Sequence, residues 1–248
     1  MPKAKATKEQ LEYDFTVLQL TPQQVAEKYG YKPRSIWRAM KYRSLSHPHI
    51  AVGYKTLSNL QKQIVVGSLM GDGHLMKNGF HWSFRIGHCL AQFQLLSWKK
   101  KILGEWVTPR GIDTEVKLGR HIFNSFTTYT HSEFDVFQPL FYPVPPKKVI
   151  SLLTLDQIEP LGLAVWFMDN GSHLTKKRGV RIHTCGFSFE ENFVIRDWFL
   201  SRWNIVVHVD KISGGYPVIT IYGDEADKFI SIIKPHILPC MEYKILDR

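Results

Sequence analysis

Two apolar segments of this chain end in the same way, and this repeated ending limits the folds that the chain can adopt. An apolar run over residues 64–71 leads to Asp72 and then glycine. A second run over residues 161–168 leads through Asp169 to Asn170, again followed by glycine. One such run alone is typical of an ordinary core helix, but Asp72 and Asn170 lie 98 residues apart, a plausible repeat length. The two runs therefore predict a duplicated fold in which two similar helices occupy matching places.

The elements expected after each apolar run also follow the same order. Extended segments, a helix, a second pair of extended segments and a final helix are predicted from periodicity, alternation and turn residues. In the first half they cover residues 80–89, 91–103, 115–117 with 121–129, and 132–141; in the second half they cover 179–189, 190–203, 205–211 with 218–222, and 225–234. The order αββαββα thus occurs twice, which predicts an α+β chain built from two related halves.

The shared ending also predicts a chemical site. Gly67 and Gly71 lie four residues apart on one face of the first helix, so two helix backbones can approach closely there. Helices packed in this way bring the oxygen ligands of Asp72 and Asn170 together. Neighbouring acidic groups repel one another unless cations lie between them, and Mg²⁺ prefers oxygen ligands. The pattern therefore favours a divalent metal site at the end of the helix pair.

Composition and charge narrow the class of protein. The 248 residues include 32 Lys and Arg against 22 Asp and Glu, a net charge of +10, and 44% of them are hydrophobic. This composition is globular, no apolar run approaches the roughly 18–20 residues that span a membrane, and no secretory signal is expected. Cys89, Cys185 and Cys240 are far apart, so neither a zinc ribbon nor a disulfide framework is indicated. The basic charge favours a nucleic acid partner over a merely soluble basic protein.

Residues 1–50 are predicted to form a helical module of their own. Leu11, Phe15 and Leu18 form one apolar face, Pro22 begins a second helix that Gly30 ends, and a third helix covers residues 33–43. The outward face of this last helix is basic and holds Arg34, Arg38, Lys41 and Arg43. Such an order is typical of helix-turn-helix modules, whose last helix enters the DNA major groove, with a purely structural cap as the alternative. Residues 44–55 are predicted to be a linker.

The segments quoted above resemble a known family. Residues 67–73 and 163–172, the latter similar to the WFMDDGS form, resemble the two motifs of single-chain LAGLIDADG homing endonucleases. Residues 145–148 and 233–244 are similar to further stretches of this family, and the resemblance covers about residues 57–246. It implies a pseudo-twofold fold in which two four-stranded antiparallel sheets form a saddle over the DNA major groove. The expected domains are a helix-turn-helix-like DNA-binding module at 1–50, a first half at 56–150 and a second half at 151–248.

The resemblance also implies a metal centre. Asp72 and Asn170 are expected to bind divalent metal, with Gly71 and Asp169 beside them. Mg²⁺ is the expected ion, Mn²⁺ is expected to substitute for it, and Ca²⁺ is expected to bind without supporting cleavage. The implied reaction is metal-dependent hydrolysis of a phosphodiester in each DNA strand.

Basic side chains are expected to assist at this centre. By the same resemblance, Lys244 matches the lysine of the second half, and Lys148 or its neighbour Lys147 matches the lysine of the first. Arg85 matches a polar position that touches the site. The counterpart of Arg85 in the second half would be Cys185, which is less suited to ordering water.

Asn170 departs from the family pattern, which has an acid at this position. Asn170 keeps a carbonyl oxygen but lacks the negative charge that holds a hard cation. Asp169 is one residue earlier and is expected to point about 100° away on a helix, which makes it a poor substitute. The residue is compatible with an inactivated enzyme, with an enzyme that cuts weakly or nicks one strand, or with a descendant that only binds DNA. We favour a nuclease with a weakened second centre.

The implied partner is double-stranded DNA, bound by a monomer inside a bacterium, a phage-infected cell or an organelle, without membrane association. The positive charge lies early in the chain, with +6 over residues 1–55, +5 over 56–150 and −1 over 151–248. The expected DNA-binding residues are Arg34, Arg38, Lys41, Arg43, His81, Arg85, Lys117, Arg120, Lys176, Lys177, Arg181, His183 and Lys211. Two other classes stay open, a DNA-binding regulator that does not cleave and an RNA maturase that assists intron splicing. An HNH nuclease is disfavoured because the histidines lack a matching Asn-His pair.

Overall fold

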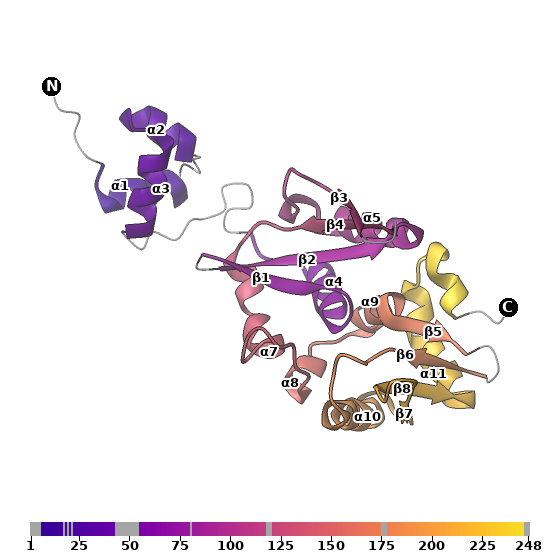
Figure 1. Ribbon diagram of the computed structural model, residues 1–248. Coiled ribbons are helices and arrows are strands. Elements are labelled where there is room, and N and C mark those ends of the chain that lie inside the picture. The colour runs from indigo at the N-terminus through magenta and orange to yellow at the C-terminus, as the bar shows by residue number, and fades with distance from the viewer. Residues whose placement is uncertain are drawn as a thin grey trace.

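The structure is a computed structural model of the chain (Figure 1). It describes residues 6–16, 18, 20, 22–42, 55–79, 81–117, 121–174 and 178–245. The linker predicted over residues 44–55 therefore falls almost wholly outside the described residues, as do Arg43, Arg120, Lys176 and Lys177. In the part of the chain that is described, every helix is too short or too polar to cross a membrane.

The N-terminal module contains the three expected helices, α1 (Lys8–Thr16), α2 (Pro22–Tyr29) and α3 (Pro33–Tyr42). Their small core consists of Ala6, Leu11, Phe15, Val25, Ala26 and Ile36. Gly30 has a φ of 66°, the left-handed conformation that ends α2 as predicted. One detail was wrong: α1 ends at Thr16, so Leu18 lies beyond the helix and is 45% exposed.

The first half places one four-stranded antiparallel sheet against its helices. Its elements are α4 (Asn59–Met70), β1 (His74–Asn78), β2 (His81–Cys89), α5 (Phe93–Leu103), β3 (Asp113–Lys117), β4 (His121–Thr127), α6 (Ser132–Asp135) and α7 (Gln138–Phe141), with single 3-10 turns at Leu90–Gln92 and Gly104–Trp106. The single helix predicted over residues 132–141 is in fact two short helices. Pro139 lies in the first turn of α7, where its missing N–H costs no hydrogen bond.

The second half repeats this arrangement after the short helix α8 (Leu152–Leu155). Its elements are α9 (Pro160–Asn170), β5 (Gly171–His173), β6 (Gly179–Ile182), α10 (Phe189–Trp203), β7 (His208–Lys211), β8 (Pro217–Tyr222) and α11 (Gly223–Ile233), followed by 3-10 segments at Lys234–His236 and Pro239–Lys244. The strand predicted over residues 179–189 is shorter than expected. It ends at Ile182, because a turn closed by the bond from Phe187 N–H to Thr184 O follows it.

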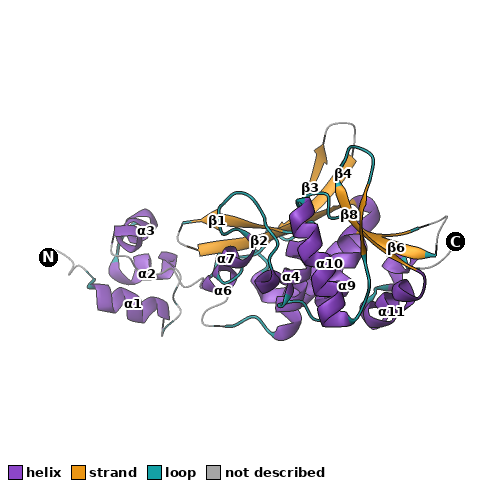
Figure 2. Cartoon of the chain, turned by 90° about the horizontal axis from the view of Figure 1, so that it is seen from below, coloured by secondary structure: helices purple, strands orange, loops and turns teal. Residues whose placement is uncertain are grey.

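The two sheets have the same topology, which confirms the predicted duplication. Their strand orders are β1-β2-β4-β3 and β5-β6-β8-β7, and every pairing is antiparallel. Helices α4 and α9 lie side by side at the centre, where the two halves meet, and beneath the strands in the view of Figure 2 (Figures 1 and 2). The chain therefore has the α+β fold of two αββαββα halves that the sequence predicts.

The two central helices are held together by close backbone contact. Residues 63–70 of α4 and 162–169 of α9 are all buried, as expected for helices surrounded by protein on every side. A Cβ atom on Gly67 would lie within 3.0 Å of Gly162 O and of Val165 Cβ. The absence of a side chain at Gly67 thus permits the approach predicted from the sequence.

Candidate active site

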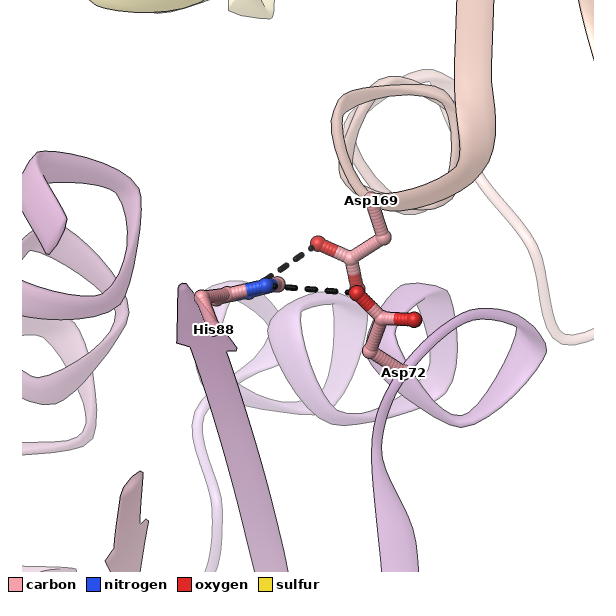
Figure 3. Close-up of side chains that lie close together, drawn as sticks. All are labelled: Asp72, His88 and Asp169. Carbon is pink, nitrogen blue, oxygen red and sulfur yellow. Dashed lines mark ion pairs between the residues drawn. The ribbon is translucent and has the colours of Figure 1, made fainter. Parts of the chain in front are cut away.

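The ends of α4 and α9 meet beside the end of β2, at the seam between the two halves (Figure 3). Ligand atoms of Asp72, His88 and Asp169 lie within 4.8 Å of one another. His88 Nδ1 is 3.2 Å from Asp72 Oδ2, and His88 Nε2 is 3.5 Å from Asp169 Oδ1. One buried imidazole therefore bridges acidic groups that come from both halves.

The two motif helices end differently, and this decides which side chains meet. Helix α4 ends at Met70, and Gly71 leaves the helical conformation with φ −105° and ψ −126°. Asp72 thus lies on a turn, and its side chain is 41% exposed. Helix α9 instead continues through Asn170, so Asp169 stays on the last helical turn with a fully buried side chain.

The expectation that Asp169 points away from this site is wrong. Its carboxylate and that of Asp72 both contact His88 (Figure 3). Neighbouring side chains on a helix point about 100° apart. This would keep Asp169 away from Asp72 only if both motifs stayed helical through their last acidic or amide residue. Helix α4 unwinds before Asp72, and this redirects the Asp72 side chain toward that of Asp169.

A buried lysine completes the cluster. Lys99 on α5 donates to Asp169 Oδ1 at 2.5 Å, and its Nζ lies 3.5 Å from His88 Nε2. Burial lowers the pKa of Lys99, and the charge of Asp169 and the hydrogen bond to it oppose this shift. Burial acts to raise the pKa of Asp72, but the hydrogen bond and charge of His88, with Lys99 and Lys244, hold that pKa below its usual value. Both carboxylates therefore lie in a positively charged setting.

Gly71 leaves a small space that is lined by oxygen atoms. Asn170 Oδ1 and Asp169 Oδ2 are buried, and neither has a hydrogen-bond partner in the described part of the chain. A Cβ atom on Gly71 would lie within 3.0 Å of both. Unpaired buried oxygens are costly unless they bind something, and oxygen ligands are those that Mg²⁺ and Ca²⁺ prefer. The residues present therefore fit a divalent cation.

Two lysines lie in corresponding places at the two motif ends. Lys148 donates to Gly71 O at 3.2 Å and to Gly73 O at 2.7 Å. Lys244 donates to Met168 O at 2.6 Å and to Asp169 O at 3.1 Å. Cations at helix C-termini are favoured by the helix dipole. Burial lowers the pKa of Lys148 and that of Lys244 to about 8, against the opposing charges of Asp72 and Asp169.

The neighbours Lys147 and Lys148 have different surroundings. Lys148 reaches the end of α4, whereas Lys147 is exposed to solvent. Sequence resemblance left this choice open, because both residues follow the same two prolines.

Arg85 has an arginine as its counterpart in the second half. Arg85 on β2 pairs with Thr127 on β4 and donates to Ser125 Oγ at 3.2 Å. In the second sheet, Arg181 on β6 pairs with Thr220 on β8. The assignment of Cys185 as the counterpart of Arg85 is therefore wrong, since Cys185 lies in the turn after β6.

The other expected DNA-binding residues come from the N-terminal module, from the strands and from the segment after β6. Arg34, Arg38 and Lys211 are exposed, Arg181 is half-buried, and His183 Nε2 lies 3.0 Å from Ser172 Oγ. His81 is held by Asp135 at 2.6 Å. The side chains of Lys41 and Lys117, and all of Arg43, Arg120, Lys176 and Lys177, lie outside what the structure describes.

His88 and Lys99 were not predicted, although the sequence carries a signal for both. His88 alternates with Phe84 and Ile86 on the buried face of β2. Lys99 shares the buried face of α5 with Leu95, Leu96 and Leu103. A basic residue at a core position usually has a specific partner, and here that partner comes from the other half.

Comparison with known proteins gives a family match and several relatives. Residues 62–229 match the model of the LAGLIDADG DNA endonuclease family. A "Protein RecA" from Mycolicibacterium fallax is 31% identical over 209 residues, which are 77% of this chain and 47% of that protein. A "Probable intron-encoded endonuclease 1" from Wickerhamomyces canadensis is 28% identical over 209 residues, which are 78% of this chain and 87% of that protein. The chain thus spans about half the length of the RecA relatives it matches.

One solved structure is similar over most of the chain. It is the homing endonuclease I-WcaI bound to its DNA recognition sequence, with a TM-score of 0.71 and 24% sequence identity. The match covers 90% of this chain and 97% of that one, and it supports the fold described above.

Proposed function

Because this chain belongs to the LAGLIDADG DNA endonuclease family, as its match over residues 62–229 shows, we propose that it is a homing-type endonuclease that hydrolyses phosphodiesters in one long duplex target with the help of divalent metal. The meeting of Asp72, Asp169 and Asn170 at the ends of α4 and α9 is the observation that carries this proposal. A site with acidic and amide oxygens and two nearby lysines suits hydrolysis without a covalent nucleophile.

The metal would be held at the motif ends. Asp72 and Asn170 are the proposed ligands, with Asp169 and the Gly71 carbonyl beside them. The buried, unpaired Asn170 Oδ1 and Asp169 Oδ2 support this assignment. When bound, Mg²⁺ or Mn²⁺ supplies Lewis acidity and polarises water and phosphate, whereas Ca²⁺ is expected to bind without supporting cleavage.

The basic residues have proposed roles that follow from their contacts. Lys148 and Lys244 each hold a proton beside one motif end, where negative charge would build up on a phosphate. With a pKa of about 8, each of the two stays mostly protonated at neutral pH and is closer to proton transfer than an ordinary lysine. Arg85, on the outer face of β2, would orient the phosphate or the water near it.

Duplex DNA would lie along the outer faces of the two sheets. Arg181 and Lys211 in the second sheet, His183 just after β6, and Arg85 and His81 in the first sheet are proposed to contact it there. The N-terminal module would add contacts through Arg34 and Arg38 on α3. The similar I-WcaI structure holds that enzyme bound to its DNA recognition sequence, which supports the proposal that this chain also binds duplex DNA.

The second centre is proposed to be weaker than the first. Asn170 is neutral, and the nearby Asp169 carboxylate already accepts a hydrogen bond from Lys99. A divalent ion gains less there than it would beside two free acids. One strand is therefore expected to be cut more slowly than the other.

The test is cleavage of supercoiled plasmid that carries the DNA flanking the chain's own coding sequence, with Mg²⁺, Mn²⁺, Ca²⁺ or EDTA. We expect nicked circles in Mg²⁺ and Mn²⁺, and binding without cleavage in Ca²⁺. Specific binding that never leads to a nick would favour the DNA-binding regulator instead. Tighter binding to intron RNA than to duplex DNA would favour the maturase.

A further inference from the structure

Lys99 is a fully buried cation whose partner belongs to the other half of the molecule. Its side chain leaves α5 among Leu95, Leu96 and Leu103 and reaches Asp169 at the end of α9. Burying an ammonium group in an apolar core is unfavourable unless it is paired. The pair with Asp169 therefore needs both halves in place, and neither half alone can form it.

The second half has a neutral buried pair between β6 and α10. Thr184, two residues beyond the end of β6, donates to Asn192 Oδ1 on α10 at 2.5 Å. Both Thr184 and Asn192 are buried. Among the described residues of these two pairs, basic side chains come from the first half only.

Lys99 brings a positive charge to the seam between the two halves, where the carboxylates of Asp72 and Asp169 lie close together. Asp72 and Asp169 bring two carboxylates to either side of one imidazole. Such groups repel one another unless a cation lies between or beside them. Lys99 supplies that cation from within the chain, and it contacts only one oxygen of Asp169, so that Oδ2 keeps its place beside Gly71.

We propose that Lys99 is the built-in counter-ion of Asp169: it stabilises the seam without bound metal and positions Asp169 so that Oδ2 stays available to the divalent ion. Lys99 is thus a positioning residue that acts through Asp169. The part that concerns the ion rests on the proposed function, whereas the part that concerns the seam does not.

The proposal predicts a specific exchange of cations. When Lys99 is lost, the buried Asp169 carboxylate loses its lysine at Oδ1 and keeps only the His88 imidazole, whose Nε2 is 3.5 Å away. A divalent ion can then take over this role, since the site gains a free negative charge and already offers oxygen ligands. A stable seam that depends little on metal should become one that needs metal.

The experiment compares thermal unfolding of the full chain without DNA, first in EDTA and then with Mn²⁺. The variants are Lys99→Met, Lys99→Arg, which keeps the charge, and Lys101→Met, an exposed lysine on the same helix. Lys99→Met should lower Tm in EDTA by roughly 10 °C, because a buried charge loses its partner. Mn²⁺ should then raise the Tm of Lys99→Met by about 5 °C or more, and the unaltered chain and Lys101→Met by less than half as much. Lys99→Arg should recover part of the loss.

The double variant Lys99→Met/Asp169→Asn keeps the test decisive if the single variant folds poorly. Removing both charges should give a more stable protein than Lys99→Met alone, and its Mn²⁺ response should disappear. The proposal is overturned if Lys99→Met unfolds like Lys101→Met in EDTA, if Mn²⁺ shifts both equally, or if the double variant is no more stable than the single one. These measurements use neither DNA nor cleavage, so the nuclease assay can fail or succeed independently of them.

Discussion

The two halves share one topology, yet their motif helices present different groups to the seam. In the first half α4 unwinds after Met70, and Asp72 reaches the site from a partly exposed turn. In the second half α9 stays helical to Asn170, and the preceding Asp169 is buried against a lysine of the first half. The matching positions of the two motifs therefore have different surroundings, because α4 ends two residues before Asp72 whereas α9 continues through Asn170.

The difference extends to the surroundings of the two ends. His88 and Lys99 lie beside the acids of the seam, and both belong to the first half. In the second half, the buried pair Thr184 and Asn192, between β6 and α10, is neutral. The two motif ends therefore share one topology but differ in the charged side chains that contact them.

Asp72→Asn should have the largest effect on cleavage. Within the described residues Asp72 pairs with His88 and with no lysine, so its loss should reduce cleavage of both strands by roughly a thousandfold, a few kcal/mol of metal-assisted stabilisation. Binding in Ca²⁺, measured by gel shift, should stay similar because Asp72 reads no base. Asp156→Asn, at an exposed acid after α8, is the matched control. Cutting at a rate comparable to that of the unaltered chain would remove Asp72 from the metal site.

Asn170→Asp should make the two halves more alike. The added acid lies beside Gly71, and Lys99 is already paired with Asp169, so the new charge should strengthen the second centre. Cleavage of the slower strand is expected to rise about a hundredfold, the usual effect of one catalytic electrostatic contact. Supercoiled plasmid should pass from nicked circles to linear DNA. Rapid linearisation by the unaltered chain would contradict this prediction and would mean that Asp169 already completes the site.

Lys148→Met and Lys244→Met should each affect the cleavage of a different DNA strand. Each lysine contacts a single motif end, so each variant should slow mainly one strand, by about tenfold or more. The two strands can be followed with separate end labels on a duplex target. Lys147→Met should leave both rates near those of the unaltered chain, because this side chain is exposed to solvent. Equal slowing of both strands by either variant would show that the centre is shared rather than divided.

Gly67→Ala tests the close approach that both halves need. The new methyl group would collide with Gly162 O, a backbone atom that cannot rotate away, so unfolding free energy should fall by about 1–3 kcal/mol. Urea unfolding measures the loss. Gly186→Ala is the control, since no heavy atom lies within 4 Å of a Cβ placed there. Equal stability of the two variants would mean that the helices separate at little cost.

Deleting residues 1–50 should have the smallest effect on the centre itself. The module lies in the most basic part of the chain, and its loss should weaken DNA binding by about tenfold and reduce the salt slope by about 0.9 for each lost phosphate contact. The relative rates of the two strands should not change. Binding titrations at several salt concentrations measure the slope, and an unchanged slope would argue against a DNA-contacting module.

Much of the fold could be predicted because it depends on local patterns. The apolar runs before Asp72 and Asn170, the turn glycines and the alternating strands predict the duplicated α+β order, which the two identical sheet topologies confirm. The errors arise where a single proline or turn shortens an element, as in residues 132–141 and after Ile182.

Some of the contacts at the motif ends could be predicted from the sequence, and their role as a metal site stays a prediction. Asp72, Lys148 and Lys244 lie at the motif ends, as family resemblance implied. The bridging His88 and the cation Lys99 were missed, because their partner Asp169 is distant in sequence.

The sequence by itself determined that this chain has two similar halves and that their apolar helices bring oxygen ligands to a common seam. Periodicity and composition are local properties, and they specify which residues are buried. Only the tertiary structure decided that Asp169 turns inward to Lys99, that Arg181 corresponds to Arg85, and that α4 unwinds before its acid. These outcomes depend on the direction of single side chains and on the point where a helix ends, and local periodicity specifies neither of them.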